Sequence, residues 1–203
     1  RGSAVGSSCG CVLPSSLGFD GKMLVCGRDP TYEAASTGRT KSCIRQQFSA
    51  PVNIQISQFG AEFIRNFRHF MHDDPEVPEL ALQSFGYLYL ADTPEFAQTL
   101  REAQSIQASM GAHTQHMTKD EIAARYPFYM LDDVIAGNHN TVNEGYFDGG
   151  TMFDWFKRMA KRRGVTFTHD EVTGMTLKAA SGAVEAGVLK SVVTVSCGPV
   201  VTA

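Results

Sequence analysis

The sequence has no long hydrophobic run and no block of charges of one sign. A membrane-spanning helix needs about 20 consecutive apolar residues, and no segment of the 203 residues approaches that length. The 18 basic and 21 acidic residues are spread along the chain and leave a net charge of -3. This pattern gives no electrostatic footprint for nucleic acid or for an anionic membrane surface. A small molecule is therefore the expected partner.

Cysteine is also scarce, and the motifs of several protein classes are missing. The five cysteines form no CxxC pair, so neither a structural zinc site nor a disulfide framework is expected. His113 and His116 are three residues apart in what reads as a polar linker without a second ligand pair, and no metal is predicted there. No nucleophile elbow or P-loop motif is present, and we expect no signal peptide. We expect a soluble cytoplasmic protein with reduced thiols.

The hydrophobic content of 43% is enough for a sizeable core, and its periodicity predicts the first elements. Residues 22–26 (KMLVC) read as a buried strand, preceded by a small-residue helix in AVGSSCGCVL. Phenylalanines recur at 59, 63, 67 and 70 at helical spacing, which predicts a helix over 57–72 with these rings in the core.

The second half predicts further alternation of strands and helices. FGYLYL at 85–90 is strand-like, Thr93 and Pro94 open a helix whose inward stripe includes Phe96, and Thr118 begins a capping box. A helix over 150–163 and the strand-like residues after it complete the pattern. Strand and helix alternate at both ends around a different middle, which favours an α/β fold with an inserted region.

Several segments carry a family resemblance when they are taken in order along the chain. They are LVCGRDPTYEAAST, SCIRQQFSAPVNIQIS, FGYLYLAD, NEGYFDGGTMFDWFKRMAKRRGV and VVTVSCGP. In this order they resemble the FAD-dependent oxidoreductases of the D-amino-acid oxidase and sarcosine oxidase superfamily. The resemblance implies a Rossmann-like FAD-binding domain at 1–80 and 141–203, with a mainly antiparallel substrate domain inserted at 81–140. It also implies oxidation of the C–N bond of an amine or amino acid.

The same resemblance implies a set of site residues. Arg45 would lie beside the isoalloxazine ring, where it stabilises negative charge on the reduced ring or meets a substrate carboxylate. A local alternative remains open, in which Arg45 caps or pairs with the helix that follows it. The cofactor-binding residues implied by the resemblance are Gly6, Arg28, Ser36, Thr37, Ser42, Cys43, Val172 and Gly198.

The sequence departs from the family pattern in ways that weaken the expected FAD site. Residues 1–6 (RGSAVG) keep only the last glycine of the GxGxxG motif, and Gly27 stands where the family usually has a ribose-binding glutamate. The family pattern also extends beyond both ends of this chain, so we expect a shortened form. Two hypotheses stay open. One is an FAD-dependent amine or amino-acid oxidoreductase, and the other is a non-catalytic interaction module without FAD that self-associates through an exposed sheet edge.

Overall fold

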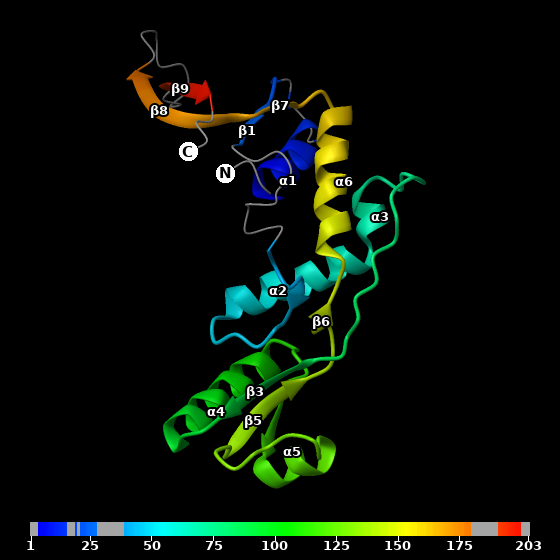
Figure 1. The fold of residues 1–203 in the computed structure, drawn as a ribbon, viewed down its shortest axis with the longest axis vertical. Coiled ribbons are helices and arrows are strands. Elements are labelled where there is room, and N and C mark those ends of the chain that lie inside the picture. Colours follow the sequence, from blue (N-terminus) through cyan, green and yellow to red (C-terminus); the bar gives the residue numbers. More distant parts are fainter. Residues whose placement is uncertain (1–3, 16–18, 20, 28–38, 180–190, 200–203) are drawn as a thin grey trace. The chain divides into compact units, whose positions relative to one another are not determined.

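The computed structural model describes residues 4–15, 19, 21–27, 39–179 and 191–199. The chain forms two compact units, one made of residues 1–40 and 150–203 and the other of residues 41–149 (Figure 1). The first unit is therefore built from both ends of the sequence, and the second is a continuous segment between them. The assignment of functional domains with boundaries at residues 80 and 140 stays a prediction.

The first unit contains a parallel pair of strands covered by helices. Its elements are α1 (Ala4–Val12), η1 (Leu13–Ser15), β1 (Leu24–Cys26), α6 (Gly149–Arg162), β7 (Thr166–Thr168), β8 (Asp170–Ala179) and β9 (Ser191–Pro199). Strand β1 pairs with β7 in parallel, while β8 and β9 form an antiparallel pair. Val25, Ala160 and Val165 form the small core between α6 and the β1–β7 pair.

Helix α1 lies close to β1 because its contact face carries no large side chain. A Cβ atom added to Gly6 would lie 3.1 Å from Cγ1 of Val25, which is tighter than ordinary van der Waals contact. Small residues on a helix allow this kind of close approach to a strand. The predicted small-residue helix packed on a sheet is confirmed.

The second unit contains a mainly antiparallel sheet with helices packed on it. Its elements are β2 (Cys43–Ile44), α2 (Pro51–Arg65), α3 (Phe67–Phe70), β3 (Tyr87–Ala91), α4 (Pro94–Ser109), β4 (Gln115–Thr118), α5 (Lys119–Arg125), β5 (Ala136–Asn140) and β6 (Gly145–Tyr146). Strand β5 lies between β3 and β4 and is antiparallel to both. A second antiparallel pair joins β2 to β6.

The two predicted helix starts in this unit are confirmed. The side chain of Thr93 accepts a hydrogen bond of 3.2 Å from the backbone N–H of Phe96 at the start of α4. Thr118 and Glu121 form the predicted capping box at the start of α5. The prediction that Phe96 points into the core was wrong, because Phe96 is 39% exposed and Ala97 and Leu100 make the contact with the sheet.

The phenylalanine stripe also differs from its prediction. The expected single helix is two helices, α2 and α3, and of the four rings only Phe67 is in the core while Phe59 is 55% exposed. Helix α2 instead buries Ile54, Ala61 and Ile64. The rings contact one another, with centroids of Phe63 and Phe70 4.7 Å apart. Helical spacing placed the rings on one face correctly, but it did not identify which face is turned inward.

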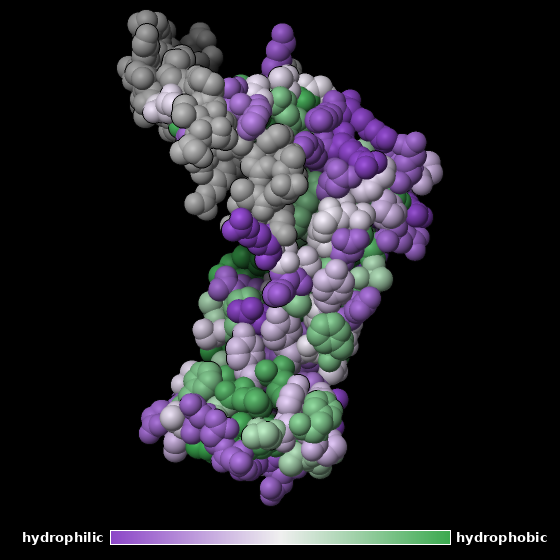
Figure 2. Space-filling model, in the orientation of Figure 1, coloured by the Kyte–Doolittle hydropathy of each residue, from purple (hydrophilic) through white to green (hydrophobic). Residues whose placement is uncertain are grey.

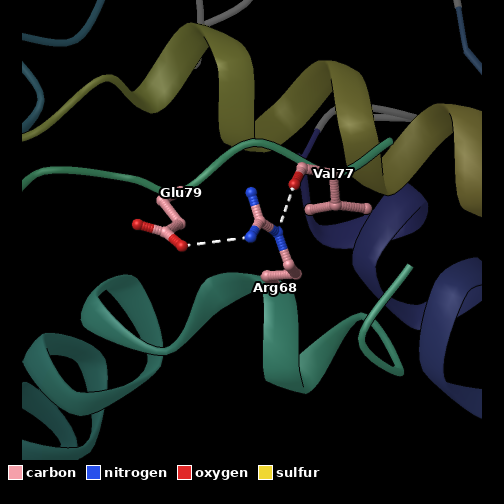
Figure 3. A network of polar contacts seen from close by, with 3 residues as sticks. All are labelled: Arg68, Val77 and Glu79. Atoms are coloured by element: carbon pink, nitrogen blue, oxygen red, sulfur yellow. Dashed lines mark hydrogen bonds and ion pairs between the residues drawn. The ribbon is translucent and has the colours of Figure 1, made fainter. Parts of the chain in front are cut away.

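The loop after α3 is held by Arg68. Its Nε donates a hydrogen bond of 2.8 Å to the carbonyl oxygen of Val77. Its Nη1 lies 3.0 Å from a carboxylate oxygen of Glu79 (Figure 3). Glu79 is largely exposed, so that ion pair contributes little to stability. The hydrogen bond to the Val77 carbonyl is the one that holds the loop, because Val77 is fully buried.

Hydrophobic side chains gather on one face of the second unit. Figure 2 shows hydrophobic side chains gathered on the part of the second unit that carries β3, β5 and α5. In the segment between α5 and β5, Phe128 and Met130 are 74% and 88% exposed. An apolar surface of this kind is a place where protein surfaces associate. The predicted self-association through an exposed sheet edge stays a prediction. No helix within the described part of the chain is both long and apolar enough to cross a membrane.

Candidate functional site

Arg45 and Glu144 are brought together by the pairing of β2 with β6. Ile44 lies opposite Gly145 in this antiparallel pair, so the next position on each strand places residue 45 beside residue 144. The backbone N–H of Phe147 donates a hydrogen bond of 3.1 Å to the carbonyl oxygen of Ser42 and extends the pairing. Two segments about 100 residues apart in the sequence thus form one site.

The guanidinium of Arg45 lies against aromatic rings. Its central carbon is 4.8 Å from the ring centroid of Phe48, 6.0 Å from that of Tyr87 and 5.7 Å from that of Tyr89. Tyr87 and Tyr89 are stacked at 6.4 Å on β3. These contacts hold the guanidinium plane in place, and within the described part of the chain they leave its hydrogen-bond donors free for another group.

One of these donors is buried. The Nε atom of Arg45 is shielded from solvent and has no hydrogen-bond partner among the described residues. A buried N–H of a charged group that lacks a partner costs free energy, and this cost is removed when an acceptor binds. A permanent positive charge with an unused, shielded donor is suited to an anionic group such as a carboxylate.

Glu144, which the β2–β6 register places opposite Arg45, is fully buried. One carboxylate oxygen accepts hydrogen bonds from the backbone N–H of Gln46 at 2.7 Å and from the side-chain amide of Asn140 at 3.0 Å. The other oxygen accepts a hydrogen bond of 2.8 Å from the side-chain amide of Gln47. All three neighbours donate, which is the arrangement that a buried carboxylate requires.

The environment changes the pKa of two groups in the site. Burial raises the pKa of the Glu144 carboxyl, and the bonds from Gln47, Gln46 and Asn140 together with the charge of Arg45 offset part of that rise. Partial burial also raises the pKa of Tyr87, with a further contribution from the Cys43 thiol, while Arg45 acts in the opposite direction. Tyr87 therefore stays a neutral phenol beside the Arg45 charge.

The predicted site residues fall into two groups in the described part of the chain. Ser42, Cys43 and Arg45 lie together in the second unit, on β2 and the residues that flank it. Gly6, Val172 and Gly198 lie in the first unit, where Val172 pairs with Cys197 and Gly198 pairs with Glu171 in the β8–β9 ladder. Arg28, Ser36 and Thr37 lie outside the described residues. The site roles of all of them stay predictions.

Most of the polar and aromatic residues around Arg45 were not predicted as site residues from the sequence. They are Gln46, Gln47, Tyr87, Tyr89, Asn140 and Glu144. The amide pair after Arg45 was a visible signal, but its acceptor Glu144 is distant in sequence. The structure also corrects the location of His116, which lies in β4 and bonds to Asn138 at 2.9 Å rather than lying in a linker. Among the described residues, no group of three or more His, Cys, Asp or Glu could hold a metal.

Comparison with protein-family models gives a match along nearly the whole chain. The model described as FAD dependent oxidoreductase matches residues 4–203. The chain belongs to this family. Its members are FAD-dependent oxidoreductases of the D-amino-acid oxidase type, so the resemblance noted from the sequence is confirmed.

Curated relatives within the family are similar to this chain over most of its length. The FAD-dependent oxidoreductase domain-containing protein 1 of Xenopus laevis is 37% identical over 153 residues, which cover 75% of this chain and 30% of that protein. The homologue from Drosophila melanogaster is 32% identical over 177 residues, which cover 87% of this chain and 34% of that protein. The chain thus spans about a third of the length of these relatives.

Solved structures of flavoenzymes share the fold. The L-proline dehydrogenase from P. horikoshii has a TM-score of 0.68 at 23% identity, and the match covers 87% of this chain and 44% of that one. The glycine oxidase from Geobacillus kaustophilus has a TM-score of 0.66 at 17% identity, with 86% and 46% covered. The predicted fold class, α/β with parallel and antiparallel parts, is confirmed.

Proposed function

We propose that this member of the FAD-dependent oxidoreductase family oxidises the C–N bond of an amine or amino acid, with Arg45 binding the anionic group. The observation that carries the proposal is the Arg45 guanidinium. It lies against three aromatic rings, and its buried Nε donor has no hydrogen-bond partner among the described residues. An amino acid brings a carboxylate of the charge and shape that this donor fork accepts.

The residues of the first unit fit part of an FAD site. In the dinucleotide-binding motif the third glycine allows close packing between helix and strand. Gly6 occupies that place in RGSAVG, and its missing Cβ is what lets α1 approach Val25. Gly198 and Val172 lie near each other in the β8–β9 ladder, as two cofactor contacts from one sheet would. These observations support FAD binding by this chain, which is part of the proposal.

The roles of the residues around Arg45 follow from their chemistry. FAD, when bound, supplies the hydride acceptor for the amine carbon. Arg45 would bind the substrate carboxylate and so fix the position of the neighbouring carbon. The rings of Phe48, Tyr87 and Tyr89 exclude water from one side of the guanidinium, which strengthens its interaction with an anion.

Paired substrates test this role of Arg45. Each amino acid, such as sarcosine or glycine, is compared with its amide, which has the same amine but no carboxylate. We expect the acid to reduce FAD bound to the protein about ten-fold or more faster at equal concentration, because only the acid forms a charge-assisted bond with Arg45. The measurement is the loss of flavin absorbance without oxygen. Equal rates for acid and amide would contradict carboxylate binding by Arg45.

The alternative function is a non-catalytic interaction module, and Gly27 favours it. Gly27 follows β1, where its backbone N–H donates a hydrogen bond of 3.2 Å to the carbonyl oxygen of Thr168. It has no side chain with which to bind the ribose hydroxyls that a carboxylate binds in the dinucleotide-binding motif. This alternative predicts a protein that self-associates and stays colourless after incubation with FAD, whereas the enzyme would retain flavin absorbance.

A further inference from the structure

Glu144 connects the segments that surround Arg45. Its carboxylate bonds to the backbone of Gln46 and the side chain of Gln47, which follow Arg45 directly, and to Asn140 at the end of β5. Glu144 also precedes Gly145, the residue that pairs with Ile44. One buried side chain therefore fixes the backbone on the C-terminal side of Arg45 to two other parts of the chain.

Gln47 extends this network to the aromatic rings. Its side-chain nitrogen donates both to Glu144 and, at 3.0 Å, to the backbone carbonyl of Tyr87. Tyr87 and Tyr89 are the β3 residues against which the Arg45 guanidinium lies. The distance between the Arg45 guanidinium and these two rings thus depends on a series of hydrogen bonds that begins at the Glu144 carboxylate.

We propose that Glu144 is a positioning residue that holds the Arg45 guanidinium against Tyr87 and Tyr89 with its Nε donor shielded. This inference rests on the proposed function, in which Arg45 binds the anion, and it says how that arginine is kept in place. Glu144 itself does not contact the substrate. It acts through Gln46 and Gln47, and its own negative charge is separated from the anion by Arg45.

A carboxylate is required at this position because all of its neighbours are donors. A glutamine at 144 would turn an N–H₂ group toward at least one of the donors on Gln46, Gln47 or Asn140. Gln47 could turn its own amide over to accept that group. Its oxygen would then face the carbonyl oxygen of Tyr87, and the bond to β3 would be lost.

The test follows the Nε–H proton of Arg45 by NMR in the full chain, without FAD. The resonance is assigned by its loss in Arg45→Lys. In the wild-type protein we expect slow exchange of this proton with water, because the Nε atom is buried. In Glu144→Gln we expect exchange to be about ten-fold or more faster, since the guanidinium is no longer held against the rings.

The control variant is Ile122→Ala. Ile122 is fully buried in α5 and packs with Met117, Leu131 and Val134, a cluster that contains no residue of the Arg45 network. A purely structural role of Glu144 would make both variants raise Arg45 exchange in proportion to their loss of stability. The proposal requires that Glu144→Gln raises it and that Ile122→Ala, at equal or greater loss of stability, does not.

Two results would overturn the proposal. One is an Arg45 exchange rate in Glu144→Gln that stays close to the wild-type rate, and the other is an equal increase in both variants. If Glu144→Gln does not fold, Gln47→Ala decides by the same comparison, because it removes the bond to Tyr87 and leaves Glu144 paired with Gln46 and Asn140. The measurement needs no flavin, so a failure of FAD binding would contradict the proposed function without changing this result.

Discussion

Arg45→Ala is expected to slow the reduction of bound FAD by an amino-acid substrate about a hundred-fold or more, because it removes a charge-assisted and partly desolvated contact with the carboxylate. Stopped-flow absorbance at saturating and subsaturating substrate measures this effect. We expect only a small change in thermal stability, because in the described part of the chain Arg45 makes ring contacts and its buried Nε donor is unpaired.

Two further variants serve as controls for this result. Arg45→Lys keeps the charge but loses the donor fork, so we expect an intermediate rate. Arg101→Ala removes an exposed arginine that contacts His116, away from the Arg45 network, and we expect the wild-type rate. If Arg45→Ala lowered stability as strongly as it lowered the rate, the arginine would be structural and the substrate role would be lost.

Gly145→Ala is expected to have the largest effect on stability. Gly145 has a φ of 150°, and a Cβ atom added there would overlap the backbone carbonyl oxygen of Gln83. Because both the clash and the backbone strain fall on the strand that pairs with β2, we expect the free energy of unfolding to fall by about 3 kcal/mol or more. Urea denaturation followed by circular dichroism measures this change.

Gly111→Ala separates the clash from the strain. Gly111 also has a positive φ, 76°, but no described atom lies within 4 Å of the position its Cβ would take. We expect this variant to lose only about 1 kcal/mol, the cost of the backbone conformation alone. Equal losses at positions 145 and 111 would show that the close contact between Gly145 and Gln83 does not contribute.

Much of the fold was predictable because its signals are local. The caps at Thr93 and Thr118 depend on a hydroxyl and the backbone N–H groups of the next turn, all within a few residues. The orientation of the phenylalanine stripe was not predictable in this way. Phe59 and Phe67 have the same character and lie on the same predicted helix face, and only the packing of distant segments leaves one exposed and buries the other.

The candidate site was predicted only in part for the same physical reason. Arg45 was recognised from the segment SCIRQQFS, whose residues are contiguous. Glu144 became part of the site only through the register of β2 against β6, which no local pattern encodes. Its burial also runs against the usual preference of glutamate for the surface, so composition gave no reason to place it beside Arg45.

The measurement that tests the account most directly is a visible absorbance spectrum of the purified full chain. The protein is incubated with excess FAD and then separated from unbound cofactor by gel filtration. The proposed oxidoreductase function predicts flavin absorbance that elutes with the protein. A colourless protein would contradict FAD binding by this chain and would favour the non-catalytic module, while its membership of the family and its fold would stand.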